Sequence, residues 1–195
     1  MIPTTEQIVE AALFAADRAL SLSELQRIFN DPIPSQEELR QLLARLQHHY
    51  DGRGIELVEV GSGFRFQTRS ELSPWVSRLW EERPPRYSRA LLETLVLIAY
   101  RQPITRGEIE EIRGVAVSSQ IIKTLQEREW VRVIGHREVP GRPALLATTR
   151  QFLDYFNLKS LEQLPPLQEL RSLEEIERHL DRVLVEEQQE QREHE

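Results

Sequence analysis

The chain contains an internal repeat, which restricts the possible folds more than any other feature of the sequence. Residues 20–29 (LSLSELQRIF) resemble residues 104–113 (ITRGEIEEIR) at a constant offset of 84. The offset places Ser21 on Thr105, and a glutamate follows each hydroxyl three residues later. This spacing is typical of a capping box, in which the two side chains bond the free N–H groups at a helix start. The repeat predicts two copies of one small structural unit.

The neighbouring segments extend each copy. An apolar helical run precedes it, a third helix start follows it, and alternating apolar and polar residues, the period of a strand, come last. These segments are residues 8–16, 35–46 and 55–69 in the first copy, and residues 90–100, 118–128 and 131–150 in the second. Three helices followed by a two-stranded hairpin form a winged helix. We therefore expect a mainly α fold with small β-hairpins (α+β class), built as two tandem winged-helix domains.

The domain boundaries follow from changes in composition. We expect an N-terminal winged-helix domain over residues 1–70 and a C-terminal one over residues 88–167. Residues 71–87 are predicted to be a stiff linker, because a short helical turn there ends at two consecutive prolines. Residues 168–195 are predicted to be a tail, helical where apolar residues recur at helical spacing and then disordered where the sequence is polar and acidic.

Each unit must take its core from its three helices and one face of its hairpin. In the first unit the predicted core residues are Leu13, Leu25, Leu39, Leu42, Val58 and Phe66. In the second they are Leu92, Leu95, Ile98, Ile109, Ile122, Leu125, Val133 and Leu146.

Catalysis finds no support in the sequence. The chain has no cysteine, which excludes disulfides, thiol catalysis and cysteine-ligated metal centres. None of the 5 histidines has a second ligand at metal spacing, and the short glycine segments near residues 52 and 61 are typical of turns. We expect no enzyme, no catalytic residue, no cofactor and no metal site. The N-terminus does not resemble a signal peptide and no apolar run approaches the ~20 residues of a membrane span. We therefore expect a cytoplasmic protein without a membrane partner or a small-molecule substrate.

Charge distribution argues against DNA as the principal partner. Residues 1–70 carry 7 basic and 10 acidic residues, residues 71–150 carry 13 and 10, and residues 151–195 carry 5 and 12. Phosphate binding requires a concentrated basic surface, and only the middle third has a positive balance, with acids interleaved. A weak contact through the second hairpin, with its three arginines Arg132, Arg137 and Arg142, stays open. DNA is expected to be reached indirectly or weakly.

Aromatic and arginine residues outside the predicted cores favour a protein partner, because such residues anchor interfaces. Trp130 is interpreted mainly as a core residue, whereas Trp75 and Trp80 in the linker fit packing and partner binding equally well. The candidate partner-binding residues are Trp75, Trp80, Tyr100, Arg101, Arg106, Arg137 and Arg142.

The stretch VPGRP at residues 139–143 is predicted to form the turn of the second hairpin. Proline followed by glycine suits the central positions of a type II turn. Because a residue before proline avoids the helical region, we expect Arg142 to be extended. Its side chain either bonds within its own domain or faces a partner.

The second unit resembles the family of bacterial segregation and condensation protein B (ScpB). Three stretches carry the resemblance: ALLETLVLIAYRQPITRGEIEEIRGV (90–115), KTLQER (123–128) and VPGRPALLATTRQFLDYFNLKSLEQLPPL (139–167). The first unit resembles the family in its order of helices and strands more than in its residues. One departure is Asn157, where the family usually has glycine.

The resemblance implies a non-enzymatic accessory subunit of the bacterial SMC condensin. Such proteins dimerise through the N-terminal winged helix and bind the kleisin ScpA, which bridges the SMC heads. The implied process is chromosome condensation and segregation during cell division, at the nucleoid. Two alternatives remain at this stage: a dimeric winged-helix transcription regulator that binds DNA, and an unrelated scaffolding adaptor.

Overall fold

The computed structural model of the 195-residue chain describes residues 3–79 and 87–164. The first unit has three helices and a hairpin: α1 (Thr5–Ala15), α2 (Leu22–Arg27), α3 (Gln36–His49), β1 (Ile55–Val60) and β2 (Gly63–Thr68). After it come a 3-10 helix (Ser70–Leu72), α4 (Ser73–Val76) and a second 3-10 helix (Ser77–Leu79). The two prolines of the expected linker, Trp80 and the expected acidic tail lie outside the described residues.

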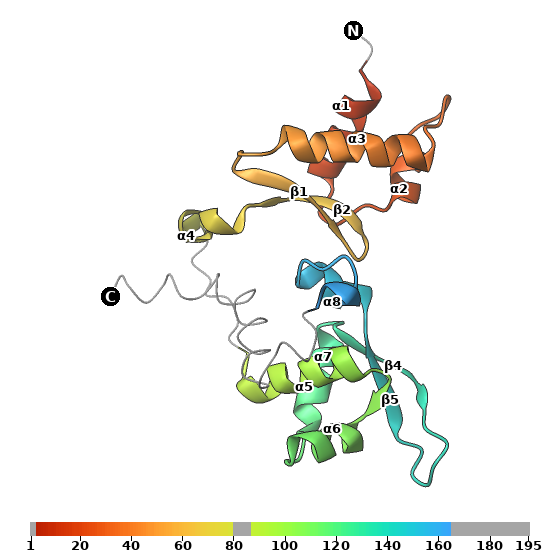
Figure 1. The fold of residues 1–195 in the computed structure, drawn as a ribbon, viewed down its shortest axis with the longest axis vertical. Helices are drawn as coiled ribbons and strands as arrows, with labels where there is room; N and C mark the ends of the chain where they lie inside the picture. Colours follow the sequence, from red (N-terminus) through yellow and green to blue (C-terminus); the bar gives the residue numbers. More distant parts are fainter. Residues whose placement is uncertain (1–2, 80–86, 165–195) are drawn as a thin grey trace.

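The second unit repeats the order of the first and adds a helix (Figure 1). Its elements are α5 (Arg89–Arg101), β3 (Ile104–Thr105), α6 (Arg106–Arg113), α7 (Ser119–Glu127), β4 (Val131–His136), β5 (Ala144–Thr148) and α8 (Arg150–Tyr155), with a 3-10 helix (Leu161–Gln163) after them. The sheets are antiparallel, β1-β2 in the first unit and β3-β5-β4 in the second. The predicted class, helices with small antiparallel sheets, is confirmed.

Both predicted capping boxes are present. The Ser21 hydroxyl accepts the Glu24 N–H, and the Glu24 carboxylate accepts the Ser21 N–H over 2.9 Å. Thr105 and Glu108 make the same pair of bonds at the start of α6. Hydrogen bonds from Ser21 are the largest cause that lowers the pKa of Glu24 from 4.5 to about 2. The repeated local sequence therefore starts two equivalent helices.

The repeat also includes a strand pairing that the sequence analysis missed. Ile104 of β3 pairs with Leu146 of β5, so the second sheet has three strands. In the first unit Leu20 forms an isolated bridge with Phe64 of β2. Leu20 and Ile104 are related by the same offset of 84. Two residues are too short a stretch for alternation to reveal, which explains why this pairing was not predicted.

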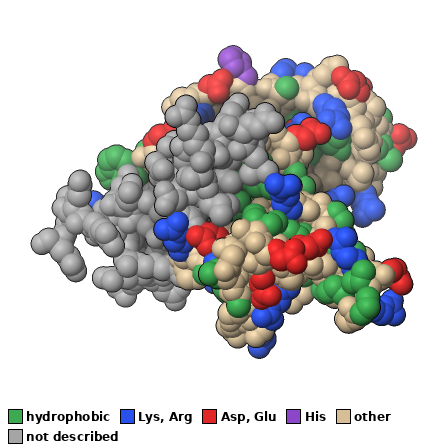
Figure 2. Space-filling view, turned by 60° about the horizontal axis from the view of Figure 1, so that its bottom comes forward, with side chains coloured by type: hydrophobic (Ala, Val, Ile, Leu, Met, Phe, Trp, Pro, Cys, Tyr) green, Lys and Arg blue, Asp and Glu red, His purple; other side chains and the backbone are tan. Residues whose placement is uncertain are grey.

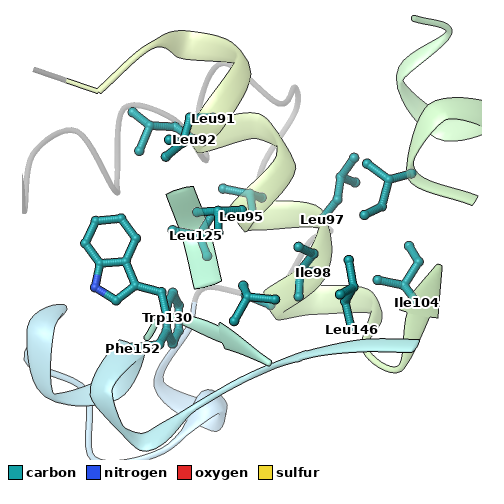
Figure 3. Packing of buried hydrophobic residues seen from close by; sticks show 14 of the residues in the cluster. Leu91, Leu92, Leu95, Leu97, Ile98, Ile104, Leu125, Trp130, Leu146 and Phe152 are labelled. Carbon is teal, nitrogen blue, oxygen red and sulfur yellow. The ribbon is translucent and has the colours of Figure 1, made fainter. Parts of the chain in front are cut away.

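Each unit has its own hydrophobic cluster. In the first, α1, α2 and α3 pack on one face of the hairpin through buried leucines and Phe64. In the second, α5 is buried along most of its length and contacts α6, α7 and β5 (Figure 3). Trp130 is 1% exposed and packs against Tyr87, Tyr155 and Phe156, so its interpretation as a core residue is confirmed.

Two core predictions, Val58 and Val133, were wrong, and strand register explains the first. Leu57, which is buried, lies opposite Phe66, whereas Val58 lies opposite Arg65 on the outer face of the hairpin. Directly opposed residues share a face, so Val58 cannot join Phe66 in the core. Val133 is 43% exposed because it belongs to β4, which is an edge strand. Phe66 and Ile122 pack against their clusters but are only partly buried.

The two units meet where the β1–β2 hairpin approaches α8 (Figure 1). The Ser62 N–H donates to the Asp154 carboxylate, and Arg65 Nη2 donates to the Asp154 carbonyl over 2.9 Å. A Cβ added at Gly61 would lie 2.6 Å from Leu153 Cβ, so glycine permits this close approach.

Candidate protein–protein interface

Of the two predicted tryptophans of the linker, the structure describes Trp75. Trp75 lies in α4 and is 64% exposed, and Leu79 nearby is exposed as well. Proline at the second position of α4 suits a helix start, because its missing N–H would have no partner there. Trp75 is thus presented to solvent next to the first hairpin. Trp80 lies outside the described residues.

Tyr100 and Arg101 form the last turn of α5. Burial raises the pKa of the Tyr100 hydroxyl, which keeps it neutral over a wider pH range. Arg101 is exposed at the C-terminal end of the helix, where a cation interacts favourably with the helix dipole. Both residues lie at an end of the helix that carries the core of the second unit.

Arg106 and Arg137 each pair with a carboxylate of α6. Arg106 Nε donates to Glu110 one turn later over 2.9 Å, and Arg137 reaches from β4–β5 to the capping carboxylate Glu108 at 2.8 Å. Hydrogen bonds from Thr105 are the main reason that the pKa of Glu108 is lowered, and Arg137 adds to the shift. These two arginines are exposed side chains held by carboxylates of their own unit.

The turn at residues 139–143 follows the prediction except at Arg142. The Arg142 N–H donates to the Val139 carbonyl over 2.9 Å and Gly141 has φ 85°, as a type II turn requires. Arg142 itself has φ 38°, so it is left-handed and not extended as expected. The next hydrogen bond, from Arg137 N–H to the Pro143 carbonyl, explains this, because the chain must turn again to pair with β4.

The side chain of Arg142 is mainly presented to solvent. It is 72% exposed, and its Nη2 lies 3.5 Å from Glu138. An exposed pair at this distance contributes little to stability. Arg142 therefore does not hold the hairpin together.

A groove of about 380 Å³ lies between α7 and the β4–β5 hairpin. Its floor is apolar and includes Ile122, Val133 and Leu146, while Arg106 and Lys123 stand at its margin. None of its lining residues is acidic. Arg106 pairs with Glu110 and Lys123 with Glu127, each one turn later on its own helix. An apolar floor with such side chains at its margin suits an amphipathic peptide. Of the six predicted residues that the structure describes, Arg106 alone lines this groove.

Sequence reasoning missed the other residues of the groove. Ile122 and Val133 were assigned to the core because each lies at the apolar position of its helical or strand period. Ile122 packs against the core cluster and also lines the groove. Val133 is exposed on the edge strand β4, which only the sheet order reveals. Exposed apolar residues also occur in the first unit, where Phe14 is 74% and Ile33 is 58% exposed.

Basic side chains form no continuous patch on the visible described surface, where they alternate with acidic ones (Figure 2). The N-terminal turn of α3 carries Glu37 and Glu38 behind its Ser35 cap. Acids suit the positive end of a helix dipole and repel a phosphate backbone. In the first unit, the third helix is therefore poorly suited to a DNA groove.

Residues 3–79 and 87–164 hold no group of three or more His, Cys, Asp or Glu side chains that could bind a metal ion. No helix in these ranges is long and apolar enough to cross a membrane.

The sequence comparisons with known proteins all point to the same family. The family model of the segregation and condensation complex subunit ScpB matches residues 7–167. A segregation and condensation protein B homolog of Coxiella burnetii is 60% identical over 171 residues, which cover 87% of this chain and 82% of that protein. Segregation and condensation protein B of Geobacillus kaustophilus is 46% identical over 182 residues, 91% of this chain and 82% of that protein.

Solved structures are similar at lower identity. ScpB from Mycobacterium tuberculosis is 27% identical and covers 81% of this chain and 99% of its own, with a TM-score of 0.36. A dimer of the ScpB N-terminal domain complexed with ScpA peptide is 32% identical, covers 43% of this chain and 100% of its own, and has a TM-score of 0.37. TM-scores this low carry no structural argument, so the family assignment rests on the sequence matches, which span both units. On these matches the chain belongs to the ScpB family of segregation and condensation complex subunits.

Proposed function

We propose that this protein is an accessory subunit of the bacterial SMC–kleisin (condensin) complex. It acts as a dimer, binds the kleisin ScpA and through it SMC, and serves chromosome condensation and segregation during cell division. The observation that carries the proposal is the family match over residues 7–167, together with 60% identity to a named segregation and condensation protein. The relative solved as a dimer with an ScpA peptide supports the same partners.

The proposed domains are residues 1–70, a linker over 71–87, residues 88–167 and a tail over 168–195. Two separate hydrophobic clusters, one in each winged-helix unit, support the first three boundaries. The N-terminal domain is the proposed dimerisation domain. Its exposed apolar side chains, Phe14 on α1 and Ile33 before α3, support a contact with a second copy.

For the ScpA contact, the candidate residues are Trp75, Trp80, Tyr100, Arg101, Arg106, Arg137 and Arg142. The groove beside Arg106 supports part of this assignment, because its apolar floor and cationic margin fit an acidic amphipathic segment of ScpA. Arg142 is suited to the rim of such a contact because it is exposed. If an Arg142→Ala variant keeps full ScpA affinity, Arg142 has no part in ScpA binding and only a structural role in the turn.

We also propose that the protein is not an enzyme and that it is located at the nucleoid. The family is named for segregation and condensation, which is the work of a structural subunit. The transcription regulator is the weaker candidate. Its best support was the basic second hairpin, but Arg137 pairs with Glu108 and Arg142 lies near Glu138, which reduces the net charge available to phosphates.

Co-expression with ScpA of the same organism tests the proposal. We expect one complex by size-exclusion chromatography with light scattering, and a dimer when the protein is purified alone. A monomer that leaves ScpA behind would refute the proposal. A gel-shift titration at about physiological salt tests the regulator, which requires sequence-specific DNA binding on the order of 10⁻⁸ M or tighter.

A further inference from the structure

Strand β4 lies at the open edge of the three-stranded sheet of the second unit. The strand order is β3-β5-β4, so among the described residues β4 pairs with β5 alone. Figure 1 shows the β4–β5 hairpin reaching beyond the helices of its unit. An edge strand presents backbone N–H and C=O groups that no neighbouring strand satisfies. The outer edge of β4 can therefore accept one more strand.

The side chains of β4 are exposed beyond its first residue. Val131 is buried in the core, whereas Val133 and Ile134 are 43% and 47% exposed. Arg132 between them is exposed as well. Edge strands are commonly protected by charged residues, by proline or by a covering element. Neighbouring exposed apolar residues beside an open edge are instead typical of a surface that binds a partner.

The groove beside α7 lies next to this edge. Val133 contributes to its lining, together with Ile122 of α7 and Leu146 of β5. Successive side chains of a strand point to opposite faces of the sheet. A strand added to β4 would thus place every second side chain on the face of Val133, over the groove. Recognition by strand addition has this form, in which backbone bonds give affinity and pockets for alternate side chains give specificity.

Arg132 favours an acidic segment as the added strand. Its side chain is exposed and makes no ion pair or hydrogen bond with any described residue. Ala147 lies opposite it on β5, so β5 offers it no carboxylate. Arg137 on the same hairpin, by contrast, already pairs with Glu108. An acidic residue on the incoming strand would therefore find a free cation at Arg132, and opposite charges on neighbouring strands attract.

The equivalent edge of the first unit has the opposite charge. Strand β1 also lies at an edge, and it carries Glu56 and Glu59. Glu56 lies 3.5 Å from Arg69, and Glu59 lies 2.6 Å from Lys159, so both carboxylates are engaged within the chain. An acidic segment is therefore expected to choose β4 over β1.

A second copy of β4 would fit the same edge poorly. Pairing two copies would bring a second Arg132 onto the same face, and like charges on paired strands repel. The register of β4 against β5 also shifts between Val133 and Gly135. Such a bulge bends the strand and limits long pairing. A short segment of another protein is the better fit.

We propose that β4 binds a short extended segment of ScpA by strand addition, with an apolar side chain in the groove and an acidic one near Arg132. The inference rests on the proposed function and specifies how the partner is bound. It gives ScpA an extended conformation at this site, whereas a helix would cover the groove without pairing with β4.

Amide hydrogen exchange tests the added strand. In the ¹⁵N-labelled full-length chain, the β4 amides that point away from β5 exchange rapidly, because no hydrogen bond protects them. We expect the middle segment of ScpA to slow their exchange about tenfold or more, while the outer amides of β1 keep their rates. If the complex forms and the β4 amides keep their free rates, strand addition is overturned and the proposed function stands. A wild-type chain that does not bind ScpA would refute the proposed function, and this inference with it.

Calorimetry of a charge-reversed variant tests the acidic contact. We expect Arg132→Glu to weaken ScpA binding about fivefold or more through like-charge repulsion. The matched variant Arg150→Glu changes an exposed arginine of α8, outside β4 and the groove, and should bind normally. Wild-type affinity in Arg132→Glu, with a folded protein by circular dichroism, would overturn the acidic contact.

Discussion

The backbone N–H of Ser62 donates to Oδ1 of Asp154 over 2.8 Å, joining two residues that are 92 positions apart in the sequence. Asp154 is only 9% exposed, so this bond is shielded from water. The same helix end accepts from Arg65, and Lys159 lies 2.6 Å from Glu59 nearby. Two units with separate cores are thus connected by polar contacts between a hairpin and a short helix.

Removal of this acceptor should weaken the junction. We expect Asp154→Ala to lower the free energy of unfolding by about 1–2 kcal/mol, because the Ser62 N–H remains buried without a partner. Urea denaturation followed by circular dichroism measures this. Asp154→Asn is the matched control, since it keeps an oxygen at the same place and should lose less. Equal losses in both variants would show that the charge of Asp154, and not its bond to Ser62, stabilises the junction.

Close approach at Gly61 gives a second, steric test. A Cβ at Gly61 would lie 2.6 Å from Leu153 Cβ, whereas one at Gly107 meets nothing within 4 Å. We expect Gly61→Ala to destabilise the protein by about 1–3 kcal/mol through overpacking. Gly107→Ala, inside α6, should stabilise it by about 0.5–1 kcal/mol because alanine favours the helix. Thermal unfolding of the two variants decides; a Gly61→Ala variant as stable as wild type would contradict the observed contact.

Capping of α2 should make stability depend on pH. The pKa of Glu24 is lowered to about 2 in the folded protein, so its ionised form stabilises the fold. This contribution is present above pH 4.5 and is lost as the pH falls towards about 2. The stability difference between wild type and Glu24→Gln should therefore shrink over that window, as measured by urea denaturation at several pH values. In a Ser21→Ala background the difference should be smaller, because the hydroxyl bond, the largest cause of the shift, is absent while the backbone N–H and Arg18 remain.

Dimerisation is predicted to depend on the exposed apolar surface of α1. Phe14 is 74% exposed, so Phe14→Lys should leave the monomer folded and shift the dimer towards monomer in analytical ultracentrifugation. Ile134→Lys, at an exposed apolar position of the second hairpin, is the matched control and should remain dimeric. If Phe14→Lys sediments as a dimer at micromolar concentration, α1 is not part of the interface.

The groove beside α7 should select acidic ligands. Val133 lines it and is 43% exposed, so Val133→Glu should fold normally and repel an acidic ScpA segment. We expect at least a fivefold loss of ScpA affinity by calorimetry. Val139→Glu introduces the same charge at the hairpin turn, outside the groove, and should cost much less. Equal losses would indicate general charge repulsion instead of a defined groove.

Much of the fold was predicted from local patterns. The capping boxes at Ser21 and Thr105 start helices as expected, and the Pro140–Gly141 turn closes the second hairpin. The repeat offset of 84 even extends to the bridge at Leu20 and the β3 strand at Ile104. Such features depend on residues close in sequence, so a single chain is sufficient to find them.

The candidate sites were harder to predict. Arg106 was expected at an interface and lines the groove, but Ile122 and Val133 were assigned to the core. The helical or strand period of a sequence does not distinguish a buried apolar residue from one on the floor of a surface groove. Trp75 was predicted as a candidate contact and is exposed, which leaves its role as a proposal.

By itself the sequence determined the two repeated units of three helices and a hairpin, their helix starts, and the family to which the chain belongs. Only the tertiary structure decided which face of each hairpin is buried. Alternation has two phases one residue apart, and only the pairing of Leu57 with Phe66 placed Val58 outside the core. It also decided the junction, because the bonds from Ser62 and Arg65 to Asp154 join positions about ninety residues apart, beyond any local pattern.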